Sequence, residues 1–191
     1  MSKKLSLSEV TIYTIGHAAR PLEDFIPLLK ERGITRLVDV RTLPKSRHNP
    51  QFNQNVLQEE LPAVEIVYTH MPGLGGLRHT RIDSPNTGWH NDSFRGYADY
   101  MQTPEFERNL KALIKYAQKD DETLAVMCAE TVPWRCHRSL IADALVVRGI
   151  TVVHIISATH SQQHKATPWA QVDGTEISYP AQDRQESLPE D

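Results

Sequence analysis

The segment 128–138, which reads CAETVPWRCHR, holds both cysteines of the chain together with acidic and basic side chains. A thiolate is a good nucleophile, and positive charge nearby makes a thiol more acidic. Cys136 is followed at once by His137, and Glu130 lies two residues after Cys128. These residue types suit thiol-dependent catalysis, in which Cys136 or Cys128 attacks the substrate while Glu130 and His137 move protons.

The elements on either side of this segment decide how reactive the thiols are. The apolar run 124–128 predicts a strand that ends at Cys128, and the pattern that follows predicts a helix from about residue 136 to 148. A helix start has unpaired N–H groups and a partial positive charge, to which Arg135 and Arg138 add. A thiol at this point is expected to have a lowered pKa and to exist partly as thiolate at neutral pH.

Ionisable residues and glycines also follow the other expected strands. Ligands of an open parallel sheet bind beyond the carboxyl ends of its strands. This rule brings the following residues to the edge where Cys128 lies: His17, Asp39, Arg41, His70, Gly75 and Gly76.

The substrate predicted for this edge is a small, anionic or nucleotide-like molecule. We expect Arg41, Arg47 and Arg138 to bind its anionic part, and Asp39, Gly75 and Gly76 to belong to the same binding site. Tyr97 follows Gly96 at a helix start and is predicted to cover the pocket as a lid contact.

Each of these residues also has a structural interpretation. Cys128 can be a buried strand cysteine that packs as a small apolar residue. Asp39 can form a structural ion pair with Arg41, and the pair Gly75–Gly76 can serve a turn that needs positive φ. The remaining alternatives are an ion pair or cap made by Glu130 and Arg138, and a solvated first-turn position for His137.

Five apolar or β-branched runs predict buried strands, at residues 11–15, 37–40, 66–70, 124–128 and 151–156. Helical periodicity predicts helices between them, at residues 21–32, 53–61, 94–101, 104–119 and 136–148. Strands that alternate with helices predict a parallel sheet, and near-continuous apolar strands are covered on both faces. The expected fold class is therefore α/β, with three layers around a five-stranded, mostly parallel sheet.

The domain organisation expected from the sequence is simple. Residues 1–10 form a polar N-terminal segment, and residues 11–157 form the α/β core, with a long polar insertion at about 77–93. Residues 158–180 form a C-terminal extension, in which Asp173–Gly174 suits the tight turn of a hairpin. Residues 181–191 are expected to be disordered.

The chain resembles the domain-of-unknown-function 488 family, whose members are related in fold to rhodaneses. The matching stretches lie between about residues 11 and 180: TIGH at 14–17, DVR at 39–41 with Pro44 and 46–47, LGG at 74–76, GYADYM at 96–101, and CAE at 128–130 through CHR at 136–138. The resemblance implies a rhodanese-like fold and little about the substrate.

In rhodanese-like enzymes the nucleophilic cysteine ends the fourth strand, and the resemblance places Cys128 at that position. The loop that follows turns its backbone N–H groups toward an anion in those enzymes. Here Glu130 adds a negative charge to this loop and Pro133 removes an N–H. This departure argues against ordinary sulfur transfer and against phosphatase activity.

Composition limits the remaining function classes. The formal net charge is −3, so no global positive field indicates nucleic-acid binding. The polar start of the chain does not resemble a signal peptide, and no apolar run approaches the roughly 18 residues that span a bilayer. We therefore expect a cytoplasmic location, no membrane partner and two reduced cysteines; the cofactor and the oligomeric state stay open.

Two alternatives to thiol chemistry use the same residues. A metal-dependent enzyme could draw its ligands from the Cys, Glu and His residues of the edge, namely Cys128, Glu130, Cys136, His137, His70 and His17, although none is assigned as a ligand. A non-catalytic module could bind a nucleotide or nucleic acid through a second set, namely Arg41, Lys45, Arg47, His48, Trp134, Arg135 and Arg138.

Overall fold

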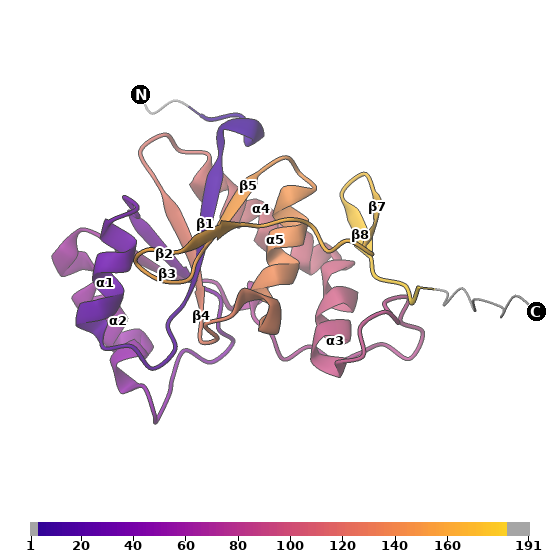
Figure 1. The fold of residues 1–191 in the computed structure, drawn as a ribbon, viewed down its shortest axis with the longest axis horizontal. Helices are drawn as coiled ribbons and strands as arrows, with labels where there is room; N and C mark the ends of the chain where they lie inside the picture. The colour runs from indigo at the N-terminus through magenta and orange to yellow at the C-terminus, as the bar shows by residue number, and fades with distance from the viewer. Residues whose placement is uncertain (1–3, 183–191) are drawn as a thin grey trace, which may run out of the picture.

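The computed structural model describes residues 4–182. The apolar runs pair into one sheet of six strands in the order β3-β2-β4-β1-β5-β6. The strands are β1 (Thr11–Gly16), β2 (Arg36–Asp39), β3 (Val67–His70), β4 (Leu124–Cys128), β5 (Thr151–Ile155) and β6 (Ser161–Gln163). β1 to β5 pair in parallel, and β6 runs antiparallel to β5 (Figure 1).

The α/β class and the mostly parallel sheet agree with the expectation from the sequence, but the expected count of five strands is one too few. The additional strand, β6, is polar and exposed along its whole length. It lies at the sheet edge and is a strand only because its backbone pairs with β5. No hydrophobic pattern marks such a strand.

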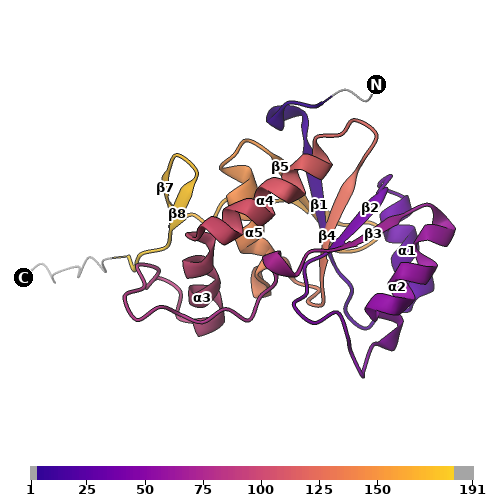
Figure 2. The same ribbon diagram turned by 180° about the vertical axis from the view of Figure 1, so that it is seen from behind.

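Helices cover both faces of the sheet (Figures 1 and 2). One face packs against α1 (Leu22–Lys30) and α2 (Gln54–Glu60), and the other against α4 (Pro104–Ala117) and α5 (Arg138–Val146). The shorter α3 (Asp92–Met101) lies beside α4. Single 3-10 turns connect these elements: η1 (Leu7–Glu9), η2 (Pro50–Phe52), η3 (Pro62–Val64), η4 (Pro72–Leu74) and η5 (Pro133–Arg135).

The sheet separates two hydrophobic clusters, and alternation along β4 decides which way its side chains point. Ala125 and Met127 join the cluster under α1 and α2. Val126 and Cys128 join the cluster under α4 and α5. Because successive strand residues face opposite sides, Cys128 is directed toward the helix that begins shortly after Cys136.

Two segments outside the sheet complete the described chain. Residues 77–91 form no helix or strand, where the sequence indicates a polar insertion. In the C-terminal extension β7 (Gln171–Asp173) pairs with β8 (Glu176–Ser178), with Gly174 at positive φ between them. Most of the tail expected to be disordered, 181–191, lies outside the described residues. No helix among residues 4–182 is long and apolar enough to cross a membrane.

Candidate functional site

A cavity of about 310 Å³ lies at the carboxyl end of β4 and contains both thiols. It is lined by Arg41, Thr42, Leu43, Gly76, Leu77, Cys128, Ala129, Glu130, Cys136 and His137. All four residues predicted to be catalytic are thus among its lining residues, as are two of those predicted to bind substrate, Arg41 and Gly76. The segments that supply them are far apart in the chain, and the parallel strand order brings them together.

Two well-anchored elements hold the sulfur atoms. Cys128 ends a strand that is paired on both sides and is 2% exposed. Cys136 is 5% exposed and lies in extended backbone between η5 and α5. Its N–H donates to the carbonyl of Pro133, and its own carbonyl accepts hydrogen bonds from the N–H and the hydroxyl of Ser139. The helix α5 therefore begins two residues later than the sequence predicts, at Arg138, and Cys136 precedes it.

The two sulfur atoms are in direct contact. Cys128 Sγ lies 2.7 Å from Cys136 Sγ, and both cysteines are free. The Cys136 sulfur also accepts the backbone N–H of Arg138 at 3.5 Å and lies 3.7 Å from His137 Nδ1. The Cys128 sulfur has a different second neighbour, the carbonyl oxygen of Glu130 at 3.7 Å, to which a thiol can donate.

These neighbours make the two thiols unequal. A hydrogen bond from Cys128, assisted by His137 and Arg138 and opposed by burial, lowers the pKa of the Cys136 thiol well below its ordinary value. Burial and then the adjacent Cys136 raise the pKa of Cys128 well above its ordinary value. Two touching sulfurs cannot both carry a negative charge, so at most one of them is a thiolate. The distance alone leaves the donor open, and the lowered pKa of Cys136 beside the raised pKa of Cys128 favours Cys128 as the S–H donor and Cys136 as the acceptor.

His137 is held beside the thiolate by its surroundings. Its ring packs on Tyr97 with 4.9 Å between centroids, and a Cβ at Gly76 would come within 3.2 Å of its Nδ1. Its Nε2 is buried and has no hydrogen-bond partner among the described residues. The side chain is thus fixed in place, with one nitrogen toward Cys136 and the other uncommitted.

The structure places Tyr97 and Gly75 differently from the prediction. Tyr97 is 1% exposed, and its hydroxyl donates to the carbonyl of Leu74. Its ring therefore packs against His137 inside the protein and does not cover the cavity. A Cβ on Gly75 would overlap Thr42 Oγ1, so this glycine serves close packing.

The turn at Gly75–Gly76 does not use positive φ, in contrast to the structural alternative that the sequence suggests. The next residue, Leu77, has a positive φ of 59°. Its side chain is 78% exposed at the cavity edge. A bulky residue in this region is under backbone strain.

Neither Arg41 nor Arg47 is placed to bind an anion in the cavity. Arg41 makes a bidentate ion pair with Asp39, at 2.9 and 2.6 Å, and donates further to His17 Nε2 and to the carbonyl of Phe52. This is the structural ion pair that the sequence left as an alternative. Asp39 is fully buried. Arg47 is exposed and does not line the cavity.

Arg138 acts as a clamp on the loop between the cysteines. It is 1% exposed, and its Nη2 donates to the carbonyls of Glu130, at 2.5 Å, and Thr131, at 3.3 Å. Its Nη1 donates to the hydroxyl of Thr14 at 3.1 Å. The guanidinium thus holds backbone oxygens, whereas the sulfur interacts with the Arg138 N–H.

A buried hydrogen-bonded chain that sequence reasoning missed begins at Thr14. Its Oγ1 lies 2.6 Å from His154 Nδ1, His154 Nε2 lies 2.9 Å from His164 Nδ1, and His164 Nε2 lies 2.7 Å from Asp143 Oδ1. If the Thr14 hydroxyl donates to His154, His154 Nε2–H donates to His164 and His164 Nε2–H donates to Asp143, each of these groups has a hydrogen-bond partner and each imidazole carries one proton. The signal that could have revealed it is Asp143 itself, an acidic residue inside the apolar helix run 140–145.

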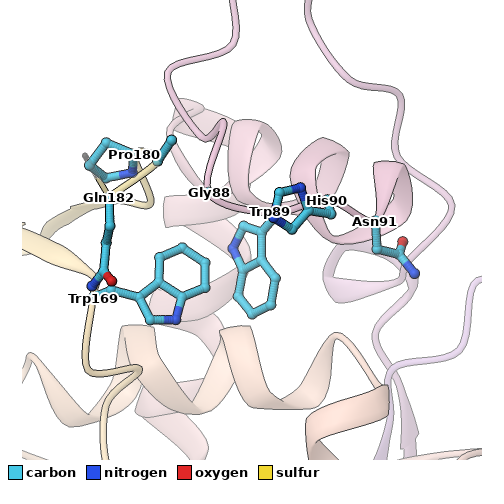
Figure 3. Close-up of a pocket in the computed structure, with 8 residues that line it drawn as sticks. Gly88, Trp89, His90, Asn91, Trp169, Pro180 and Gln182 are labelled. Atoms are coloured by element: carbon cyan, nitrogen blue, oxygen red, sulfur yellow. The ribbon is translucent and has the colours of Figure 1, made fainter. Parts of the chain in front are cut away.

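Larger cavities in the molecule lack this chemistry. One of about 680 Å³ is lined by Gly88, Trp89, His90, Asn91, Trp169, Pro180, Ala181 and Gln182. Its main wall consists of the two indoles, whose centroids are 4.7 Å apart (Figure 3). Among the described residues its lining includes no thiol and no carboxylate, so its size does not make it the better candidate.

The metal alternative finds no ligand set in the structure. Within residues 4–182, no three His, Cys, Asp or Glu side chains are grouped in a way that could hold a metal ion. Two of the named candidates are occupied by other contacts, since His17 bonds to Arg41 and His70 Nε2 donates to the carbonyl of Arg41.

Comparison with known proteins identifies a family without an assigned activity. A family model described as "Domain of unknown function DUF488" matches residues 21–145, which is more than half of the chain. The match includes the cavity-lining residues from Arg41 to His137. Neither the curated proteins nor the solved structures contain a match.

Proposed function

The chain belongs to the family of domain of unknown function DUF488, and from the geometry of its own site we propose that it is a thiol-dependent enzyme acting on a small molecule. Cys136 is the nucleophile. The observation that carries the proposal is the 2.7 Å contact between Cys136 Sγ and Cys128 Sγ inside a cavity that a ligand can enter.

Each lining residue has a role in such a reaction. The Cys136 thiolate forms a bond to an electrophilic atom of the substrate, and the leaving group departs with the electron pair of the bond that breaks. The Cys128 S–H is the nearest proton source for that group, and His137 can then restore the proton to Cys128 through the same cavity. Water or a second substrate releases the bound group from Cys136.

The charge of the cavity favours a substrate without strong negative charge. The guanidinium of Arg41 is neutralised by Asp39, and Glu130, an exposed residue, lines the same cavity as the two thiols. The walls near the opening are apolar, with Leu43 72% and Leu77 78% exposed. We therefore propose a small neutral substrate in place of the anionic one that the arginine count suggests.

The likeness to rhodaneses belongs to this proposal as well. Cys128 ends the fourth strand of a parallel sheet, at the position of the rhodanese nucleophile. The more acidic thiol here is the second one, Cys136. On this proposal the fold is shared with rhodaneses, while the attacking sulfur comes from the loop just before the next helix.

Alkylation by iodoacetamide as a function of pH tests the assignment of the nucleophile. With each cysteine followed by mass spectrometry, Cys136 should react with a midpoint well below the roughly 8.5 of an ordinary thiol. Cys128 should react at much higher pH. Cys128→Ala, which removes the S–H donor, should raise the Cys136 midpoint, whereas Cys128→Ser, which keeps a donor, should raise it less. Alkylation midpoints near roughly 8.5 for both cysteines would contradict the proposal. So would a Cys136 midpoint that is the same in Cys128→Ala as in the wild type.

A further inference from the structure

The separation of the two sulfurs is short enough for them to become bonded. A disulfide has an S–S distance of about 2.05 Å, so the 2.7 Å contact needs an approach of less than roughly 1 Å. Cys128 is fixed in β4, while Cys136 lies in extended backbone outside any helix or strand. We therefore expect Cys136, and not Cys128, to move when the bond forms.

We propose that this chain reduces small neutral disulfides, with Cys136 as the attacking cysteine and Cys128 as the resolving cysteine. The inference rests on the proposed function and specifies its substrate class. A lone nucleophile would need no second thiol in contact with it, and a structural cysteine would not share a cavity with an acidic one.

The reaction has two steps that balance. The Cys136 thiolate attacks one sulfur of the substrate R–S–S–R, so that a Cys136–S–S–R bond forms, the substrate S–S bond breaks and RS⁻ leaves. Cys128 then loses its proton and attacks Cys136 Sγ, which forms the Cys128–Cys136 disulfide and releases the second RS⁻. The two electrons come from the two protein thiols, and a low-molecular-weight thiol reduces the protein disulfide again.

The site supports the second step as well as the first. Once Cys136 is capped it no longer carries negative charge, so the part of the raised Cys128 pKa that comes from Cys136 is removed, while the part that comes from burial remains. His137, whose Nδ1 lies 3.7 Å from Cys136 Sγ in the same cavity, is the nearby base to which we assign the Cys128 proton. The resolving sulfur is already in contact with its target, Cys136 Sγ, so only the short approach that forms the S–S bond is needed.

The size and charge of the cavity set the substrate class. A volume of about 310 Å³ accommodates a small organic disulfide. The exposed carboxylate of Glu130 disfavours acidic disulfides, and Leu43, Leu77 and Ala129 offer apolar contacts to a neutral one.

The test mixes the fully reduced protein with bis(2-hydroxyethyl) disulfide near neutral pH and follows products by intact mass and peptide mapping. The wild type should form the Cys128–Cys136 disulfide and release two equivalents of 2-mercaptoethanol. Cys128→Ser and Cys128→Ala should stop after one equivalent, with the mixed disulfide retained on Cys136. In Cys136→Ser the release of 2-mercaptoethanol should be at least tenfold slower than in the wild type. Dithiothreitol should return the wild type to the dithiol.

The outcomes separate this inference from the proposed function. If the wild type keeps a stable mixed disulfide on Cys136, as the Cys128 variants do, Cys128 does not resolve and the substrate class is wrong, while the Cys136 nucleophile stands. If no variant forms a mixed disulfide and Cys136 alkylates like an ordinary thiol, both fail. Circular dichroism of each variant, with two different replacements at Cys128, separates a chemical loss from a loss of folding.

Discussion

At the level of single residues, the reactivity that we propose for Cys136 rests on three contacts that local sequence only partly encodes. The N–H of Arg138 and the ring of His137 are neighbours in the chain. The strongest contributor is Cys128, which reaches the sulfur from the end of a strand. A thiol beside a helix start is therefore only part of the arrangement; the second thiol supplies the hydrogen bond that stabilises the charge.

The negative charge of Glu130 should slow the reaction of anionic reagents with the Cys136 sulfur. We expect Glu130→Gln to raise the rate of Cys136 alkylation by iodoacetate severalfold while the rate with neutral iodoacetamide changes little, because only the charged reagent is repelled. The ratio of the two rates, measured at low ionic strength, is the readout. Glu59→Gln, an exposed change on α2, is the matched control. An unchanged ratio in Glu130→Gln would show that this carboxylate does not control entry.

At the level of elements, α5 links the thiol loop to the C-terminal extension. Its first residue, Arg138, holds the carbonyls of the loop, and Asp143 holds the extension. The Asp143 carboxylate accepts hydrogen bonds from His164 Nε2, the N–H and hydroxyl of Thr167, and the hydroxyl of Tyr179. A single buried helix thus fixes both the site and the segment that follows β5.

Replacement of Asp143 should therefore destabilise the whole chain. In Asp143→Asn the amide N–H₂ would face groups that donate, and one or more buried donors would lose their acceptor. We expect a loss of about 2–4 kcal/mol in the free energy of unfolding, measured by urea denaturation. Asp173→Asn, the same change on the exposed β7–β8 turn, should stay within about 0.5 kcal/mol. Equal effects of the two changes would mean that the Asp143 contacts are not stabilising.

At the level of the whole molecule, two buried histidines should make stability depend on pH. His17 is 2% exposed, and burial lowers its pKa to about 4. His154 is 3% exposed, and burial followed by the nearby His164 and Arg138 lowers its pKa to about 3. In the unfolded chain both histidines bind a proton near pH 6.5, so between pH 6.5 and about 4 the unfolded state holds more protons than the folded state.

Their contribution to stability is therefore fully present above pH 6.5 and is lost as the pH falls toward 4. The slope can reach about 1.4 kcal/mol per pH unit for each histidine. Urea denaturation at a series of pH values should show this decline. His17→Gln and His154→Gln should each flatten it, even if they also lower stability at all pH values. His48→Gln, at an exposed position, should leave the slope unchanged, and a steep slope that survives both buried changes would refute the assignment.

The sequence by itself determined the local features. Apolar runs and helical periodicity located β1 to β5 and the helices, because burial of strands and helix faces leaves a regular pattern in the chain. The position of Cys128 at a strand end and of Cys136 before a helix followed from the same pattern. Together with the rule that ligands bind beyond strand ends, this was enough to predict that Cys128, Glu130, Cys136 and His137 share one site.

Only the tertiary structure decided what these side chains do for one another. The bidentate pairing of Arg41 with Asp39, the clamp made by Arg138 and the buried chain from Thr14 to Asp143 join residues up to 140 positions apart. The polar edge strand β6 is likewise defined only by its partner. A hydrogen bond depends on which atoms meet in space, and no local pattern in the sequence records a partner brought in from elsewhere in the chain. For the same reason the sequence could list two thiols and three arginines for the site, but it could not show that the sulfurs touch, that the guanidinium groups of Arg41 and Arg138 are bound to other residues, or that Arg47 does not line the cavity.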